Sequence, residues 1–219
     1  MTDDPHTLDS LPSVIPVFPL PGVILLPGAS LPLNIFEPRY LKMVRDAVTG
    51  NGLIGMIQPS GDVAAAKPDL FTVGGVGTIA DFSETDDDRI LIRLKGLSRF
   101  RVAEELPVMT PYRQVRADWE AFADDPWGGK EAGPVNRDLL LDSLKEYLES
   151  KGLDADFKAI ASAPDDVLVN TLSMIVPMPT QEKQALLEAG TISDRSALLE
   201  NLLHMASQSN STSGNSTAH

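Results

Sequence analysis

The stretch from Val14 to Phe36 constrains the fold more than any other part of this chain, because it carries no charged residue. A run of about 20 uncharged residues is long enough to form a membrane-spanning helix. Prolines interrupt this run repeatedly, and each one in a helix interior would remove a hydrogen bond and cost about 3 kcal/mol. The prolines are Pro16, Pro19, Pro21, Pro27 and Pro32. Their spacing predicts short strands joined by turns, with no membrane span.

The chain from this stretch to Glu120 is predicted to be mostly β-strand. Apolar runs bounded by turn residues predict strands at residues 15–18, 30–36, 53–58 and 112–119. One helix interrupts them, with Pro38 in its first turn and Gly50 just beyond its end. Two longer segments, residues 73–82 and 89–104, are expected to pair as a hairpin across an acidic turn.

The second strand of this hairpin alternates regularly between apolar and basic residues. The apolar set is Ile90, Ile92, Leu94, Phe100 and Val102, and the basic set is Arg89, Arg93, Lys95, Arg99 and Arg101. Because successive side chains of a strand point to opposite faces, this pattern predicts one buried face and one exposed basic face. The segment is too long to run straight in a small domain, so Gly96 is expected to mark a bend or bulge.

The C-terminal part of the chain changes to a helical pattern. Apolar stripes with helical spacing continue as far as Ala206, and the last residues are mostly Ser, Thr, Asn and Gly. We therefore predict an α+β fold: an N-terminal β-barrel with a short helix, followed by a C-terminal α-helical bundle. The predicted boundaries are a flexible N-terminus at 1–13, the barrel at 14–125, the bundle at 134–206 and a disordered tail at 207–219.

Composition argues against most catalytic and metal chemistry. Cysteine is absent, which excludes disulfides and thiolate metal sites and fits a reducing compartment. The first residues carry Asp3, Asp4 and Asp9 but no basic residue, so no secretory or mitochondrial signal is expected and cytoplasm is the predicted location. The three histidines are His6, His204 and His219, two of them near chain ends expected to be flexible, so neither a Ser-His-Asp triad nor a multi-histidine metal site is expected. We expect no catalytic residue, no metal and no cofactor.

Two weaker candidates have simpler explanations. A Ser-Lys dyad needs only two residues brought together by the fold, so Ser98 and Ser143 stay open, although a surface or capping role is the simpler interpretation. The acidic run Asp86–Asp88 offers carboxylates to a cation but lacks the spaced ligands of a calcium loop, which favours a solvated hairpin tip.

Several motifs together resemble one known family. They are Phe18-Pro19-Leu20-Pro21-Gly22, Leu26-Pro27-Gly28 and Ile35-Phe36-Glu37-Pro38-Arg39-Tyr40, followed later by Lys95–Val102 and Glu182–Glu188. In this order they resemble the Lon N-terminal domain family, in particular its small stand-alone members. The resemblance implies a pseudo-barrel related to the PUA-like fold, followed by a helical bundle. In full-length Lon proteases the ATPase and Ser-Lys protease domains lie downstream, and neither fits within 219 residues.

The resemblance implies a non-catalytic module that binds unfolded segments or partner proteins, such as a Lon-type protease or its substrates, in protein quality control. The candidate contact residues are Leu20, Pro21, Leu26, Phe36, Glu37, Arg39 and Tyr40. The alternative is an RNA-binding module that uses the basic strand face, with Arg93, Lys95, Arg99 and Arg101. A net charge of -13 makes nucleic acid the less favoured partner.

Overall fold

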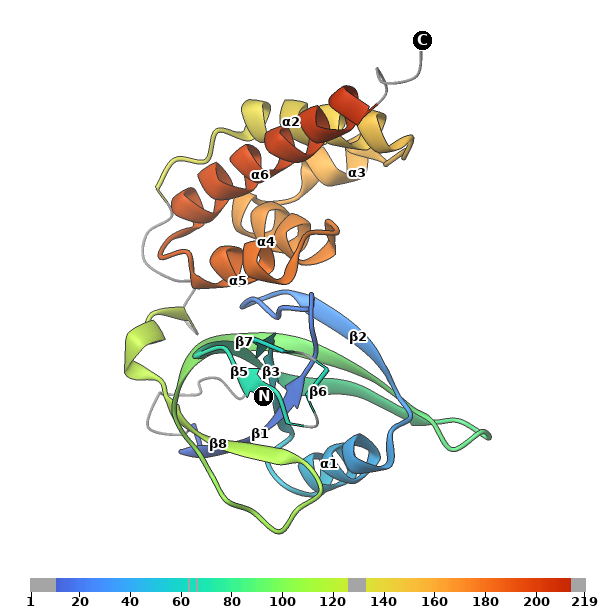
Figure 1. The fold of residues 1–219 in the computed structure, drawn as a ribbon, viewed down its shortest axis with the longest axis vertical. Helices are drawn as coiled ribbons and strands as arrows, with labels where there is room; N and C mark the ends of the chain where they lie inside the picture. Colours follow the sequence, from blue (N-terminus) through green and yellow to red (C-terminus); the bar gives the residue numbers. More distant parts are fainter. Residues whose placement is uncertain (1–10, 63, 66, 126–132, 214–219) are drawn as a thin grey trace, which may run out of the picture. The chain divides into compact units, whose positions relative to one another are not determined.

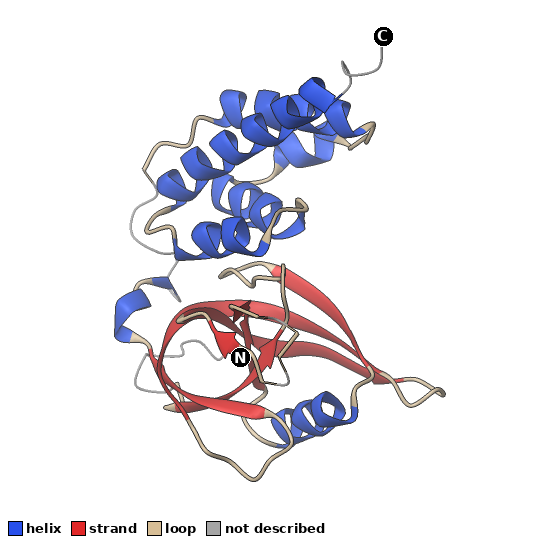
Figure 2. Ribbon diagram, viewed as in Figure 1, coloured by secondary structure: helices blue, strands red, loops and turns tan. Residues whose placement is uncertain are grey.

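The computed structural model describes residues 11–62, 64–65, 67–125 and 133–213. Contacts divide the chain into two compact units. The first unit comprises residues 1–130 together with 177–187, and the second comprises residues 131–176 and 188–219. The first is built on a β-sheet and the second from helices (Figures 1 and 2), so the fold is a mixed α+β fold.

A six-stranded sheet that closes on itself forms the first unit. Its strands are β1 (Val14–Pro19), β2 (Ser30–Ile35), β3 (Leu53–Ile57), β6 (Val73–Glu84), β7 (Ile90–Glu105) and β8 (Arg113–Asp118). They lie in the order β2-β7-β6-β3-β1-β8, and β7 also pairs with β8. The second pairing closes a barrel and leaves β2 as an edge strand, paired with β7. The predicted strands and the hairpin are confirmed.

Smaller elements complete this unit. Helix α1 (Pro38–Thr49) connects β2 to β3, as predicted, and buries Tyr40, Met43 and Val44. Strands β4 (Pro59–Ser60) and β5 (Asp69–Leu70) form a separate two-stranded ribbon, and a 3-10 helix, η2 (Glu120–Phe122), follows β8. The barrel interior holds a cluster of apolar side chains, in which the rings of Phe100 and Trp119 lie 6.0 Å apart.

Strand β7 changes face partway along its length. Val76 and Gly77 are consecutive in β6, but they pair with Ser98 and Gly96, so Leu97 is an extra residue in β7. The bulge expected at Gly96 is therefore confirmed. A one-residue insertion moves every later side chain to the opposite face. Simple alternation predicts that Phe100 shares a face with Ile90, Ile92 and Leu94. Because of the bulge, Phe100 lies on the opposite face.

Two glycines allow the chain to cross closely over strands β6 and β7. A Cβ atom on Gly75 would lie 1.8 Å from the carbonyl oxygen of Leu25, and one on Gly96 would lie 2.0 Å from that of Leu26. Only glycine leaves room for such an approach. Leu25 and Leu26 are fully buried as a result. This corrects the expectation that Leu26 offers an exposed contact surface.

Helix α5 (Thr180–Glu188) contributes to the first unit, although the sequence places these residues with the predicted helical bundle. Gln184 is buried, and its amide donates to the Val73 carbonyl oxygen at 3.1 Å. The Gln58 amide in turn donates to Gln184 Oε1 and to the Thr180 carbonyl oxygen, both at 3.0 Å. These bonds attach α5 to the sheet.

The second unit contains helices α2 (Arg137–Lys151), α3 (Phe157–Ser162), α4 (Asp165–Ile175) and α6 (Ile192–Ser213). Helices α2 and α4 both pack against α6, and the buried residues follow the predicted apolar stripes: Leu140, Leu144, Leu168, Leu172, Leu199 and Leu203. Inside this unit, Arg195 donates to Asn170 Oδ1 at 2.9 Å.

Helix α6 continues to Ser213, so residues 207–213 are helical where the sequence predicts a disordered tail. The rest of that predicted tail, and residues 1–10 of the predicted flexible N-terminus, lie outside the described residues. Within the described ranges, no helix is both long enough and apolar enough to cross a membrane.

Candidate functional site

A groove on the first unit gathers side chains from several turns. Its volume is about 380 Å³. The apolar part of its lining consists of Ala65, the rings of Tyr40 and Tyr112, and the prolines Pro19, Pro21, Pro59, Pro68 and Pro111. Its charged lining residues are Arg39, Lys67 and Arg113. The groove therefore combines rigid apolar walls with cationic groups.

The proline turn after β1 forms one wall of the groove. The Leu20 N–H donates to the Ile57 carbonyl oxygen at 3.0 Å, and the Gly22 N–H donates to Gln58 Oε1 at 2.9 Å. Gly22 has a φ of 73°, which L-residues with side chains rarely adopt. Because the turn is fixed to the end of β3, Pro21 holds its position without a bound ligand.

The start of helix α1 provides the aromatic part of the groove. The Tyr40 ring lies 4.2 Å from the Phe18 ring and is only 6% exposed, so its burial raises the pKa of its hydroxyl. The Arg39 guanidinium lies 4.6 Å above the Tyr40 ring and donates to Glu37 Oε2 at 2.8 Å. Arg39 and Glu37 are both well exposed, so their charged ends remain accessible to solvent.

The opposite side of the groove is organised by Arg113. Its guanidinium donates to Glu105 Oε1 at 2.9 Å and to the Pro68 carbonyl oxygen at 2.7 Å. Lys67 also contacts Glu105 Oε1, at 2.9 Å. The hydrogen bond from Arg113 is the main reason that the pKa of Glu105 lies below its usual value, and Lys67 adds to the effect. One carboxylate thus holds two cations in place.

The second tyrosine connects the loop before β8 to helix α1. The Tyr112 hydroxyl donates to Asp46 Oδ2 at 2.9 Å. Burial, followed by this bond to a carboxylate, raises the pKa of Tyr112 to about 12. Sequence reasoning missed Tyr112, Lys67 and Arg113, although Pro68 and Pro111 marked turns beside them.

The structure brings some of the predicted contact residues together and separates others. Pro21, Arg39 and Tyr40 line the groove, whereas Leu20 lies between two lining prolines in the chain and Glu37 pairs with the lining residue Arg39. The remaining two are not among the lining residues: Phe36 is 61% exposed, with the Arg89 guanidinium 5.8 Å from its ring, and Leu26 is fully buried.

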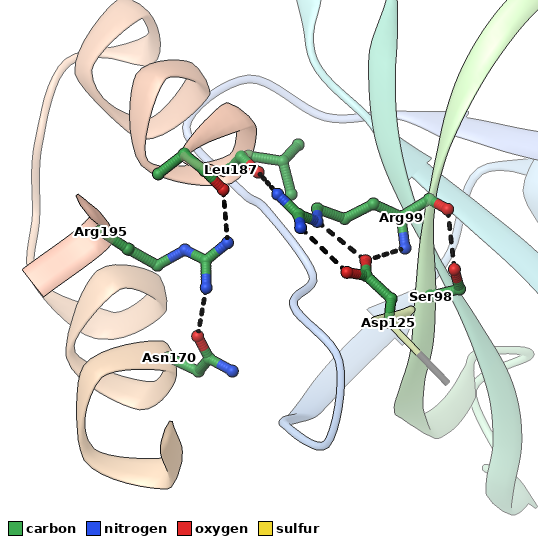
Figure 3. A network of polar contacts seen from close by, with 7 residues as sticks. Ser98, Arg99, Asp125, Asn170, Leu187 and Arg195 are labelled. Atoms are coloured by element: carbon green, nitrogen blue, oxygen red, sulfur yellow. Dashed lines mark hydrogen bonds and ion pairs between the residues drawn. The ribbon is translucent and has the colours of Figure 1, made fainter. Parts of the chain in front are cut away.

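The predicted basic strand face does not form as expected. The bulge in β7 places Arg99 on the face opposite Phe100, away from the barrel interior, where it is 5% exposed and pairs with Asp125 at 2.8 Å. Arg99 also donates to the Leu187 carbonyl oxygen at 3.0 Å (Figure 3). Arg93, which pairs with Asp81, and Lys95 and Arg101 are exposed, but the extra residue Leu97 places Arg101 on the opposite face from Arg93 and Lys95. The four residues therefore do not form the single basic face from which the RNA-binding alternative was inferred.

The serines and aspartates that the sequence left open as candidates, Ser98, Ser143 and Asp86–Asp88, are not among the groove-lining residues. Ser98 is buried, and its hydroxyl donates to the Arg99 carbonyl oxygen at 2.9 Å (Figure 3). No three histidine or carboxylate side chains in the described part of the chain gather closely enough to hold a metal ion. The groove lining is instead suited to non-covalent contacts with rings, apolar groups and anions.

Comparison with known proteins identifies relatives along most of the chain. The family model of the ATP-dependent protease La (LON) substrate-binding domain matches residues 14–205. Lon protease 2 of Myxococcus xanthus is 28% identical over 202 residues, and Lon protease of Anaeromyxobacter dehalogenans is 27% identical over 201 residues. Each alignment covers 90% of this chain but 24% of the relative, so the chain spans about a quarter of the length of these proteins.

Two solved structures share the fold. A Lon N-terminal domain protein from Xanthomonas campestris aligns with a TM-score of 0.61 and 24% identity over 85% of this chain and 96% of its own. The N-terminal domain of the Mycobacterium avium complex Lon protease aligns with a TM-score of 0.60 and 14% identity over 87% and 97%. The family model, the relatives and the shared fold agree: this chain belongs to the family of Lon protease substrate-binding domains.

Proposed function

We propose that this chain is a non-catalytic module that binds unfolded segments of other proteins in the groove between Pro21, Arg39 and Pro68, and that it serves protein quality control in the cytoplasm. In this proposal the barrel carries the binding surface and the helices of the second unit form a separate bundle. The main observation in support of this proposal is that three of the contact residues inferred from the sequence line one groove: Pro21, Arg39 and Tyr40.

The dimensions and walls of the groove support this proposal. Ligand pockets typically have volumes of about 300–1,000 Å³, so a groove of about 380 Å³ has room for a few side chains of an extended segment. Proline and tyrosine side chains have few rotatable bonds, so little conformational entropy is lost when a ligand packs against them. Hydrogen bonds fix Pro21 and Pro68 in position beforehand.

Two exposed apolar residues lie close in sequence to groove-lining residues and offer further contact area to a bound segment. Phe36, which precedes the Arg39 segment, is 61% exposed, and Met109, which precedes Pro111, is fully exposed. Large exposed apolar side chains are typical of surfaces that bind other proteins. Because the relatives are proteases, we also propose that the bound segments belong to substrates of a Lon-type protease.

A single pair of substitutions tests this function. Ala64 and Ala65 are both exposed in the same turn, but only Ala65 is a groove-lining residue. Ala65→Trp should fill the groove and weaken binding of a fluorescein-labelled, permanently unfolded polypeptide by about tenfold or more, measured by fluorescence anisotropy. Ala64→Trp should leave binding unchanged, and both variants should keep the wild-type melting temperature.

Two results would contradict the proposal. The first is equal binding by the two tryptophan variants, which would place the contact surface elsewhere. The second is failure of the wild-type chain to retain any sequence on an array of overlapping peptides from unfolded proteins.

A further inference from the structure

We propose that the groove prefers acidic segments, and specifically segments in which an aspartate or glutamate lies next to an aromatic residue. This inference rests on the proposed function, because it names the kind of unfolded segment that the same groove takes. It follows from the signs of the lining charges, the accessibility of their head groups and the nature of the walls.

Every charged residue among the described residues that line the groove is basic: Arg39, Lys67 and Arg113. The carboxylates that pair with them, Glu37 and Glu105, are not lining residues. Glu105 is shared by Lys67 and Arg113, so two positive charges face one negative charge there. This local excess of positive charge lies on a chain whose net charge is -13. Charge complementarity therefore favours an anionic ligand at this place on the surface.

The cationic groups are accessible to a ligand. The side chain of Lys67 is 68% exposed and that of Arg39 is 50% exposed. The exposed pair between Arg39 and Glu37 contributes at most about 1 kcal/mol, because water screens both charges. A ligand carboxylate can take its place and accept two parallel hydrogen bonds from the guanidinium. Arg113, whose side chain is 17% exposed, instead keeps the Lys67 segment in position.

The walls between these cations suit an aromatic ring. Five proline rings provide rigid apolar surface, and the exposed guanidinium of Arg39 lies 4.6 Å above the buried Tyr40 ring. Aromatic rings pack well against such surfaces and against a neighbouring guanidinium. A ring in the groove would place the carboxylate of an adjacent residue near Arg39 or Lys67. The combination of carboxylate and ring is therefore the ligand chemistry that the lining complements best.

Matched peptides test this preference in the full chain. Three fluorescein-labelled peptides share one aromatic residue and the same glycine-serine spacer, and differ in carrying Asp and Glu, Asn and Gln, or Lys at the flanking positions. Fluorescence anisotropy should show the acidic peptide binding about tenfold more tightly than the amide peptide, with the lysine peptide weakest. The difference should shrink at high salt, because the groove is open to solvent.

Substitutions of single basic residues test whether the groove is the source of the preference for acidic peptides. Arg39 and Arg45 lie on helix α1, have side chains that are 50% and 51% exposed, and each pair with one glutamate, but only Arg39 lines the groove. Arg39→Gln should reduce the preference for the acidic peptide over the amide peptide several-fold, and Arg39→Lys should restore most of it. Arg45→Gln is the matched control and should keep the wild-type preference. Lys67→Gln should act like Arg39→Gln.

The outcomes separate this inference from the proposed function. If the acidic and amide peptides bind equally well and Ala65→Trp abolishes both, the preference is overturned and the groove remains a peptide site. If none of the three peptides binds and the unfolded polypeptide does not bind either, the proposed function itself is contradicted, and the preference falls with it. If the lysine peptide binds most tightly, or a short single-stranded RNA displaces the acidic peptide, the assignment of an acidic protein segment is overturned.

Discussion

Two arginines of the first unit make ion pairs of the same length in opposite surroundings. Arg99 and Asp125 lie 2.8 Å apart with side chains 7% and 8% exposed, whereas Arg39 and Glu37 lie 2.8 Å apart with side chains 50% and 43% exposed. The distance is therefore no guide to the role. A buried pair cannot exchange its partner for water, while an exposed pair can exchange it for water or for a ligand.

Arg99 and Arg39 also differ in how many groups they contact. Its backbone N–H and its Nε both donate to Asp125 Oδ2, its Nη2 donates to Asp125 Oδ1, and its Nη1 donates to the Leu187 carbonyl oxygen. The Phe122 ring lies 4.4 Å from its guanidinium. Arg99 thus connects strand β7 to the segment after β8 and to helix α5, within a single unit. Arg39 has one carboxylate partner and one ring beside it.

The largest effect should come from breaking the buried pair. Asp125→Ala leaves the Arg99 guanidinium buried without its carboxylate, which should lower the free energy of unfolding by about 3–5 kcal/mol. Urea unfolding followed by tryptophan fluorescence measures this, because Trp119 is buried in the core cluster of the first unit.

The control is the double replacement Arg99→Met, Asp125→Leu, which removes both charges and should recover most of the lost stability. A loss of less than about 1 kcal/mol in Asp125→Ala would show that this pair behaves like an exposed one.

An intermediate effect is expected at Glu105, which is partly buried between Arg113 and Lys67. Its pKa in the folded chain lies below its usual value of 4.5, chiefly because Arg113 donates a hydrogen bond to it. The stability that it contributes is therefore present above pH 4.5 and is lost as the pH falls through the lower, folded-state pKa.

Glu105→Gln should cost about 1–2 kcal/mol near neutral pH, and the gap to wild type should narrow below pH 4.5. Denaturation across a pH series measures the gap. Glu104→Gln is the control, because Glu104 is exposed and lies 3.5 Å from its partner, Arg116. A gap that stayed constant from neutral to acidic pH would show that the charge of Glu105 does not contribute.

The smallest effect is expected at the exposed pair. Arg39→Gln should change the free energy of unfolding by less than about 1 kcal/mol, as should Arg45→Gln on the same helix. Thermal unfolding of the two variants side by side measures the difference. A loss above about 2 kcal/mol in Arg39→Gln alone would mean that Arg39 supports the fold, and its cationic group would then not be available to a ligand.

The sequence predicted the strands, helix α1 and the family, because these depend on local patterns such as the proline turns from Val14 to Phe36. It placed Arg99 on the wrong face because a single extra residue, Leu97, reverses the alternation, and the position of a bulge depends on pairing with β6. The groove could be predicted only in part. Arg39 and Tyr40 belong to a recognisable motif, whereas Lys67 and Arg113 reach the same place only through tertiary folding.

The edge strand β2 has a consequence for the proposed binding of unfolded segments. Unfolded segments tend to add to an open sheet edge as a further strand, and such additions can grow into aggregates. Pro32, in the middle of β2 and opposite Arg93, has no backbone N–H to offer an incoming strand. A captured segment therefore finds no continuous row of donors along this edge. If the proposed function holds, Pro32 allows an unfolded segment to bind reversibly in the groove and opposes its addition to the sheet as a further strand.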